Sequence, residues 1–264
     1  MIYEAEILCL GNEILIGRTI NTNGSFLAKH LSQLGFKVTR ITTVRDELEA
    51  GQNIILEILQ RKPHALCITG GLGPTHDDIQ LILLSHALQR PLVRNEEAFD
   101  MIKKRYQEMN PSREKMAELP EGSSPLHNSQ GSAPGVLTIS GTTMIFSMPG
   151  VPREMEAIFS QQIAPLLNKK FEFDEETYEF GVDVRGVRES DLTEFTTQVM
   201  KEFPNISFKS HPKKDEEGFF LSLHTYAITT DRKQVENALR KWIEIIEMKY
   251  TVTKMTDIRS VMEF

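Results

Sequence analysis

The feature that most constrains the fold is an alternation of apolar and amphipathic segments along the N-terminal part of the chain. Short segments rich in apolar or β-branched residues are typical of strands, and apolar residues at helical spacing follow each of them. Such an alternation predicts parallel strands joined by right-handed crossovers, and therefore an α/β domain on a mostly parallel sheet. The three expected strands are residues 3–10, 37–44 and 64–69. The three expected helices are residues 23–35, 48–61 and 78–89.

Local signals define the ends of these helices. Asn23 is a candidate N-cap for the first helix, and Gly35 fits its C-terminal end. Pro63 ends the second helix. The third helix is so apolar that we expect both of its sides to be covered.

The elements expected after residue 90 are shorter. A helix at 95–109 is predicted to end at Pro111. Residues 120–135, PEGSSPLHNSQGSAPG, are expected to form a long loop, which in a compact domain is usually functional or disordered. Strands at 136–139 and 143–147 follow, before a turn and another helix.

The charged segment KKFEFDEE at 169–176 marks an expected boundary between two domains, 1–170 and 171–264. The second domain is predicted to contain a strand, a helix, two strands and a helix, which is the pattern of a small α+β domain. Its segment HPKKDEEG is expected to be a hairpin loop.

Composition excludes several classes of protein. Of the 264 residues, 40% are hydrophobic and 25% are charged, as in a globular protein with a packed core. The net charge of −7 argues against a general binder of nucleic acids or membrane surfaces. The N-terminus lacks the pattern of a signal peptide, and no apolar run approaches the length of a membrane helix. We expect a cytoplasmic protein in which Cys9 and Cys67 are buried free thiols.

Three carboxylates, Glu13, Asp46 and Asp78, follow the three expected strand ends. In an open parallel sheet, ligands bind beyond the carboxyl ends of the strands, where the strand order reverses. If the strand order is 2-1-3, the three loops share one rim. A single acid after a strand is ordinary, because Asp and Glu favour turns and helix starts. Three acids on one rim beside a glycine loop favour a binding or catalytic site.

The segment ITGGLGPTHDD, which ends at Asp78, combines a possible anion site with two carboxylates. Gly70, Gly71 and Gly73 permit a left-handed backbone and close approach of a ligand. A helix start expected near Asp77 would add partial positive charge. The spacing matches neither a Walker A motif nor a dinucleotide fingerprint. The structural alternative is that one of the aspartates only caps the helix.

A divalent cation reconciles these two parts, because Mg²⁺ typically bridges one or two carboxylates to ligand phosphates. We therefore expect Mg²⁺, Mn²⁺ or Co²⁺, with Asp77 and Asp78 as candidate ligands.

Further polar residues are candidate contacts for a small molecule. The segments GSAPG and MPGVPRE form Pro-Gly turns, which are either rigid turns only or loops that contact a ligand, with Arg153 pairing with a phosphate or carboxylate. Asn21 and Asn23 either cap a helix or hydrogen-bond a ribose or base. The candidate substrate-binding residues are Gly70, Gly71, Gly73, Thr75, Asn21, Asn23, Lys115, Ser132, Gly150 and Arg153.

Taken in order, GNEILIGRTINTNGSFLAKHLSQLGF, TTVRDE, TGGLGPTHDD, LPEG, GSAPG and MPGVPREM resemble the N-terminal region of the competence/damage-inducible CinA proteins. That region belongs to the molybdopterin-binding superfamily of MogA, MoaB and MoeA. The resemblance covers residues 3–168. The tail, including GVRESDL at 186–192, is similar to the KH-type domain that follows in CinA proteins.

The resemblance implies a three-layer α/β/α domain followed by a small KH-type domain. It implies metal-dependent hydrolysis of ADP-ribose to AMP and ribose 5-phosphate, or a pocket for molybdopterin as in MogA-like relatives. Asp78 and Asp46 match aspartates of those relatives, and Glu13 matches the acid of the GxE motif, so these three are the candidate catalytic residues. A homo-oligomer with a nucleotide or pterin substrate is expected. The tail has no GXXG loop, so we expect it to bind no nucleic acid and instead to dimerise or cover the pocket.

The sequence departs from the family pattern at three positions. Asn12 replaces an Asp, Gln80 replaces a common Thr, and Ser132 replaces a Thr while keeping the hydroxyl. The loss of the Thr leaves a non-hydrolytic binding protein as the alternative to a pyrophosphatase. Because the sequence ends at Phe264, we do not expect the amidase domain of full-length CinA proteins or its deamidase activity.

Overall fold

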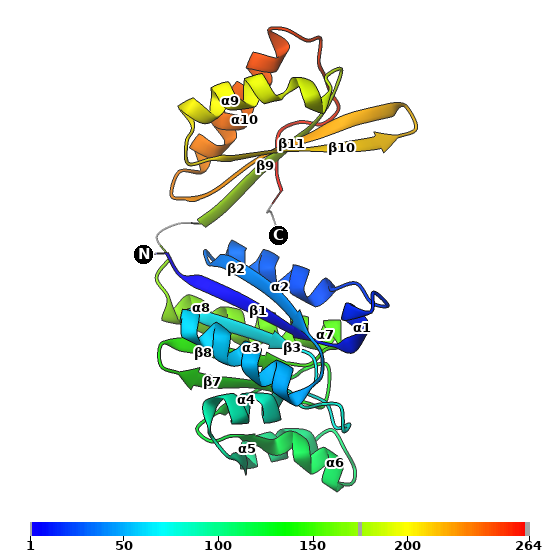
Figure 1. Cartoon of the computed structure of the whole chain (residues 1–264), viewed down its shortest axis with the longest axis vertical. Helices are drawn as coiled ribbons and strands as arrows, with labels where there is room; N and C mark the ends of the chain where they lie inside the picture. The colour runs from blue at the N-terminus through cyan, green and yellow to red at the C-terminus, as the bar shows by residue number, and fades with distance from the viewer. Residues whose placement is uncertain (1, 174–175, 262–264) are drawn as a thin grey trace. The chain divides into compact units, whose positions relative to one another are not determined.

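The structure, a computed structural model, describes residues 2–173 and 176–261. Two compact units divide the chain, Met1–Glu172 and Phe173–Phe264, and Figure 1 shows the elements of each. Each unit has its own hydrophobic core. None of the helices in the described ranges is long and apolar enough to cross a membrane.

The first unit is built on a six-stranded sheet in the order β2-β1-β3-β8-β7-β6. Strands β2, β1, β3 and β8 are parallel, and β7 and β6 are antiparallel to their neighbours. The first three strands therefore have the order 2-1-3, the condition under which the loops after them share one rim. The strand bounds are β1 Glu4–Leu10, β2 Lys37–Val44, β3 Ala65–Thr69, β6 Ser124–Leu126, β7 Gly135–Ser140 and β8 Thr143–Met148.

Helices cover both faces of this sheet (Figure 1). Alternate residues of a strand point to opposite faces, and Leu8 and Leu10 of β1 pack in one core cluster with Ile55 of α3 and Leu83 of α4. Helix α2 packs against β1 and α7. The helix bounds are α2 Thr22–Gln33, α3 Leu48–Arg61, α4 Gln80–Leu88, α7 Pro152–Ile158 and α8 Ala164–Lys170, with a π-helical turn Phe159–Ile163 between the last two.

The apolar helix α4 is covered on two sides, as its composition predicts. Leu83 and Leu84 belong to the cluster beneath α3, whereas Leu81 belongs to a second cluster that includes Ala98 and Ile102. The elements around this second cluster are β4 Leu92–Arg94, α5 Glu96–Lys103, α6 Pro111–Glu114, a 3₁₀ turn Lys115–Ala117 and β5 Glu118–Pro120.

Two expectations for this region are wrong. The helix expected at 95–109 ends at Lys103, and Pro111 begins α6 because Asn110 caps it, with its side chain accepting a hydrogen bond from the Arg113 N–H. The segment 120–135 is not one long loop, since it contains β6, which pairs antiparallel with β7.

The second unit is an antiparallel sheet in the order β10-β11-β9-β12, with two longer helices, which is the predicted α+β pattern. Trp242 of α10 is in its core. The expected hairpin at HPKKDEEG is present, but its loop is shorter than expected, because β10 and β11 stay paired as far as Asp215 and Gly218 and only residues 216–217 form the turn. The bounds are β9 Glu176–Arg185, α9 Thr193–Glu202, β10 Ser207–Asp215, β11 Gly218–Thr229, α10 Arg232–Glu247, β12 Thr253–Lys254 and β13 Arg259–Ser260.

Candidate functional site

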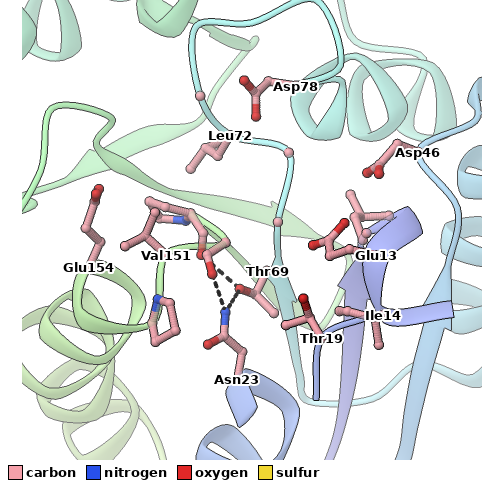
Figure 2. Close-up of a pocket in the computed structure, with 18 of the residues that line it drawn as sticks. Glu13, Ile14, Thr19, Asn23, Asp46, Thr69, Leu72, Asp78, Val151 and Glu154 are labelled. Atoms are coloured by element: carbon pink, nitrogen blue, oxygen red, sulfur yellow. Dashed lines mark hydrogen bonds between the residues drawn. The ribbon is translucent and has the colours of Figure 1, made fainter. Parts of the chain in front are cut away.

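A cavity of about 450 Å³ lies in the first unit, beyond the carboxyl ends of β1 and β3. The loops that follow β1, β2, β3 and β8 all contribute to its walls, together with the start of α2 (Figure 2). The volume is in the range of small-molecule sites. The short helix α1, Asn12–Leu15, which the sequence pattern did not predict, forms part of the wall after β1.

The cavity wall carries an excess of negative charge. Among the described residues that line it there is no Lys, Arg or His, whereas five carboxylates are present, namely Glu13, Asp46, Asp77, Asp78 and Glu154. Burial raises the pKa of Asp46 above its usual value, although its carboxylate accepts a hydrogen bond from the Asn12 N–H at 3.1 Å. Repulsion from Glu13, Asp77 and Asp78 raises it further. This wall favours a cation or a ligand rich in hydrogen-bond donors.

The glycine loop after β3 has a backbone that other residues adopt with difficulty. Gly70 and Gly71 have φ angles of 100° and 68°, and a Cβ atom on Gly70 would lie 2.1 Å from the Leu10 carbonyl oxygen. The backbone N–H groups of Leu72 and Gly73 donate no hydrogen bond to other residues in the described part of the chain. Both residues line the cavity, so their N–H groups are available to an anion.

The Asp78 carboxylate is held by Thr75. The Thr75 N–H and hydroxyl both donate to Asp78 Oδ2, at 2.8 Å and 2.6 Å. Helix α4 begins at Gln80, and Ile79 at its N-cap position makes no side-chain cap. The expected helix is present but begins at Gln80, later than the expected start near Asp77, and neither aspartate caps it. The Thr75 N–H is used by Asp78, so it is not available to a phosphate as the sequence suggested.

Gln80 ties the glycine loop to the neighbouring strand. Its fully buried side chain donates from Nε2 to the carbonyl oxygens of Gly70 and Met148, and its N–H donates to the Gly71 carbonyl at 3.0 Å. These hydrogen bonds from Gln80 to the carbonyl groups of Gly70 and Gly71 stabilise the left-handed backbone of the loop. The position of Gln80 in the sequence, two residues after Asp78, gave no indication of that role.

Asn21 and Asn23 have different roles. Asn21 caps α2, because its side chain accepts a hydrogen bond from the Gly24 N–H at 2.8 Å. The expectation that Asn23 is the cap is wrong. Asn23 is instead buried, and its Nδ2 donates to Thr69 Oγ1 at 3.0 Å and to the Gly150 carbonyl at 2.9 Å (Figure 2). Both asparagines line the cavity.

The remaining candidate residues divide into two groups. Ser132 and Gly150 line the cavity, and Ser132 Oγ lies 2.7 Å from the Tyr106 hydroxyl. Lys115 does not line it but lies behind the glycine loop, with Nζ donating to the carbonyl oxygens of Thr75 at 2.9 Å and Asp78 at 2.8 Å. Arg153 is exposed and does not line it either.

Glu154 is the functional candidate that sequence reasoning missed. It lies one residue after Arg153 in the same MPGVPRE turn, and in the structure it lines the cavity across from Glu13 and Asp46 (Figure 2). Ile20 and Val151, also not expected, line the cavity with largely exposed apolar side chains. The signal in the sequence was the glutamate at the start of a helix after a Pro-Gly turn, which is also what an ordinary helix start contains.

The carboxylates fit a cation that takes few protein ligands. Within the described residues, no three side chains of His, Cys, Asp or Glu form a group that could hold a metal ion by themselves. Mg²⁺ is commonly bound by one or two carboxylates together with phosphate oxygens and water. The oxygen-rich wall and the raised pKa of Asp46 agree with such an ion rather than with a complete protein cage.

Known proteins resemble this chain over most of its length. A family model described as "Probable molybdopterin binding domain" matches residues 6–169. A protein of Metallosphaera sedula is 43% identical, over 82% of this chain and 82% of its own. A protein of Pyrobaculum aerophilum is 39% identical, over 93% of this chain and 95% of its own. A crystal structure of the protein CinA, with unknown function, from Thermoplasma acidophilum is 34% identical with a TM-score of 0.60, and the match covers 62% of this chain and 98% of that one.

Proposed function

The chain belongs to the family of probable molybdopterin binding domains, and on that premise we propose that its first unit binds a phosphate-bearing pterin or nucleotide together with a divalent cation. One observation carries this proposal. A glycine loop with unused backbone N–H groups and a rim of carboxylates line the same cavity, with no basic side chain among its described lining residues. An anionic ligand in such a cavity requires a cation beside it.

Each part of the wall has a separate role in this proposal. The N–H groups of Leu72 and Gly73 would hold phosphate oxygens, and Asp78 with Asp46, Asp77 or Glu13 would hold the cation. A bound Mg²⁺, Mn²⁺ or Co²⁺ would neutralise the phosphate charge. Thr75 and Lys115 would act indirectly, by holding the loop that carries Asp78.

A second candidate function is hydrolysis of a pyrophosphate bond, as in ADP-ribose, to AMP and ribose 5-phosphate. The observation that favours it is Asp46, whose pKa is raised by burial and by the neighbouring carboxylates, as suits a group that takes a proton from water. Asp78, Asp46 and Glu13 are the candidate catalytic residues. Non-hydrolytic binding agrees better with the family, and hydrolysis requires a separate test.

One set of measurements tests both functions. Purified protein is titrated by calorimetry with ADP-ribose and with a molybdopterin-type ligand, with and without Mg²⁺, Mn²⁺ or Co²⁺, and AMP release is followed by chromatography. Metal-dependent binding that Asp78→Asn abolishes supports the binding function. Asp100→Asn, an exposed aspartate on α5, is the matched control. AMP release by the wild type but not by Asp78→Asn supports hydrolysis. Absence of ligand binding with every metal would contradict the proposal.

For the second unit we propose a KH-type fold that serves in dimerisation. Two helices with a three-stranded antiparallel core, in the order β10-β11-β9, support this. Light scattering of the full chain measures the oligomer, and filter binding with RNA at low salt is expected to be negative.

A further inference from the structure

The cavity has two chemically different ends. Glu13 and Asp46 lie on one wall, and Glu154 lies across from them (Figure 2). The first end offers carboxylates for a cation beside the glycine loop. The second end offers one carboxylate among smaller and apolar groups. It therefore suits a part of the ligand other than the phosphate and its cation.

Glu154 is held in place by a buried frame. Its Oε2 accepts a hydrogen bond from Asn128 Nδ2 at 2.8 Å. Asn128 is 4% exposed, and its Oδ1 accepts from the N–H groups of Gln130 at 3.0 Å and Gly131 at 2.9 Å. A Cβ atom on Gly131 would lie 1.9 Å from Glu154 Oε2, so the glycine leaves the space that the carboxylate occupies.

The Glu154 carboxylate keeps capacity to accept hydrogen bonds. Each of its oxygens has two lone-pair sites, and the Asn128 amide takes one. No Lys, Arg or His forms an ion pair with Glu154 in the part of the chain that the structure describes. A half-buried carboxylate of this kind is stabilised by a donor that arrives with the ligand.

The groups around Glu154 suit a flat ring. Leu72, Ala133 and Val151 line the cavity with it. Leu72 and Ala133 are buried, whereas Val151 is 47% exposed and offers apolar surface to a ligand. Apolar walls with one well-placed polar group are typical of sites for heterocycles.

We propose that Glu154 is a specificity-determining residue for a 2-amino-4-oxopyrimidine ring, the ring shared by pterins and guanine. That ring presents a ring N–H and an exocyclic NH₂ side by side, and a carboxylate accepts both in a bidentate pair. Adenine has no such pair, because the ring nitrogen beside its amino group carries no hydrogen. Glu154 therefore discriminates against adenine. This inference rests on the proposed binding function and adds the class of base.

The test compares ligands that differ only in the base. Wild-type protein with Mg²⁺ is titrated with GDP, ADP and 6-hydroxymethylpterin diphosphate. We expect GDP or the pterin to bind at least tenfold more tightly than ADP, and the better of the two identifies the source of the ring. Glu154→Gln should weaken that ligand by about tenfold or more while leaving ADP unchanged, because a charged hydrogen-bonded pair is lost. Glu154→Asp keeps the charge, so its affinity for that ligand should lie between those of the wild type and of Glu154→Gln.

The control is Glu156→Gln, which makes the same charge change on the same helix at an exposed position outside the cavity. It should leave all three affinities unchanged. If neither GDP nor the pterin binds more tightly than ADP, or if the preference survives Glu154→Gln, the role of Glu154 is overturned and the proposed binding function still stands. No binding of any phosphate ligand by the wild type would overturn both.

Discussion

Thr75 donates two hydrogen bonds to a single oxygen of Asp78, from its N–H at 2.8 Å and from its hydroxyl at 2.6 Å. The aspartate is thereby fixed at the end of the glycine loop, where it lines the cavity. Because these two residues lie three positions apart in a turn, the carboxylate is oriented locally and does not depend on a distant partner.

Removing the Thr75 hydroxyl tests this orientation. Thr75→Val keeps the side-chain volume and the hydrogen bond from the N–H to Asp78. It loses the exposed hydrogen bond from the hydroxyl. We expect about fivefold weaker metal-dependent ligand binding, because an exposed hydrogen bond of this kind contributes about 1 kcal/mol. Calorimetry measures the affinity. Thr197→Val, at an exposed position of α9, removes a comparable hydroxyl and is the control that should leave binding unchanged.

Gln80 should matter both for stability and for binding. Gln80→Leu leaves the buried Gly70 carbonyl oxygen without its donor, whereas the Met148 carbonyl oxygen keeps the hydrogen bond from the Gly70 N–H. We expect a loss of about 2–3 kcal/mol in the free energy of unfolding, and weaker ligand binding because the loop is no longer held. Circular dichroism during thermal unfolding measures the first effect. The exposed Gln107→Leu serves as control, and equal melting temperatures for the two variants would contradict the role of Gln80.

Asp46→Asn should have opposite effects on stability and on binding. Burial and neighbouring carboxylates raise the pKa of Asp46 in the folded protein, so ionised Asp46 destabilises the ligand-free fold once the pH exceeds the unfolded pKa. At pH 7 the variant should therefore be more stable than the wild type, by at most about 1 kcal/mol in the free energy of unfolding, because the group is half-exposed. At pH 3 the two proteins should have equal stability. The variant should also lose metal-dependent binding. A variant that melts lower at pH 7 would contradict this account.

In the second unit, Asp183 should stabilise the fold at neutral pH. Burial alone would raise its pKa, but hydrogen bonds from Ser222 at 2.5 Å and Arg259 at 3.0 Å lower it below the usual value. The contribution is present above the unfolded pKa, about 3.9, and is lost as the pH falls through the lower folded pKa.

We therefore expect Asp183→Asn to cost about 1 kcal/mol at pH 7 and nothing at pH 2. Trp242, the single tryptophan, lies in the core of this unit, so its fluorescence during urea unfolding measures this unit alone. Exposed Asp257→Asn is the control. A loss that persists at pH 2 would indicate a packing effect instead.

The two cysteines should be inert in the native protein. Both are buried and free, and burial raises the pKa of the Cys67 thiol to about 12. The thiolate is the reactive form, so an aromatic disulfide reagent at pH 8 should label neither thiol until urea is added. Labelling of one thiol per chain in the native protein would show that a cysteine is accessible.

The sequence by itself determined the first strands and helices and the parallel pairing of these strands. Periodicity placed α3 at Leu48–Arg61, and the alternation of strand and helix predicted the parallel pairing of the first strands, whose order the structure shows to be 2-1-3. That order brings Glu13, Asp46 and Asp78 to one cavity, since neighbouring parallel strands end at the same edge. These results follow from local and nearest-neighbour rules, which a single sequence contains.

Only the tertiary structure decided which polar side chains enter the cavity. Asn21 rather than Asn23 caps α2, and this allows Asn23 to reach Thr69. Glu154 faces the cavity while its neighbour Arg153 points to solvent. The direction of each side chain depends on partners that lie far away in sequence, such as Asn128 for Glu154, and no local pattern specifies them.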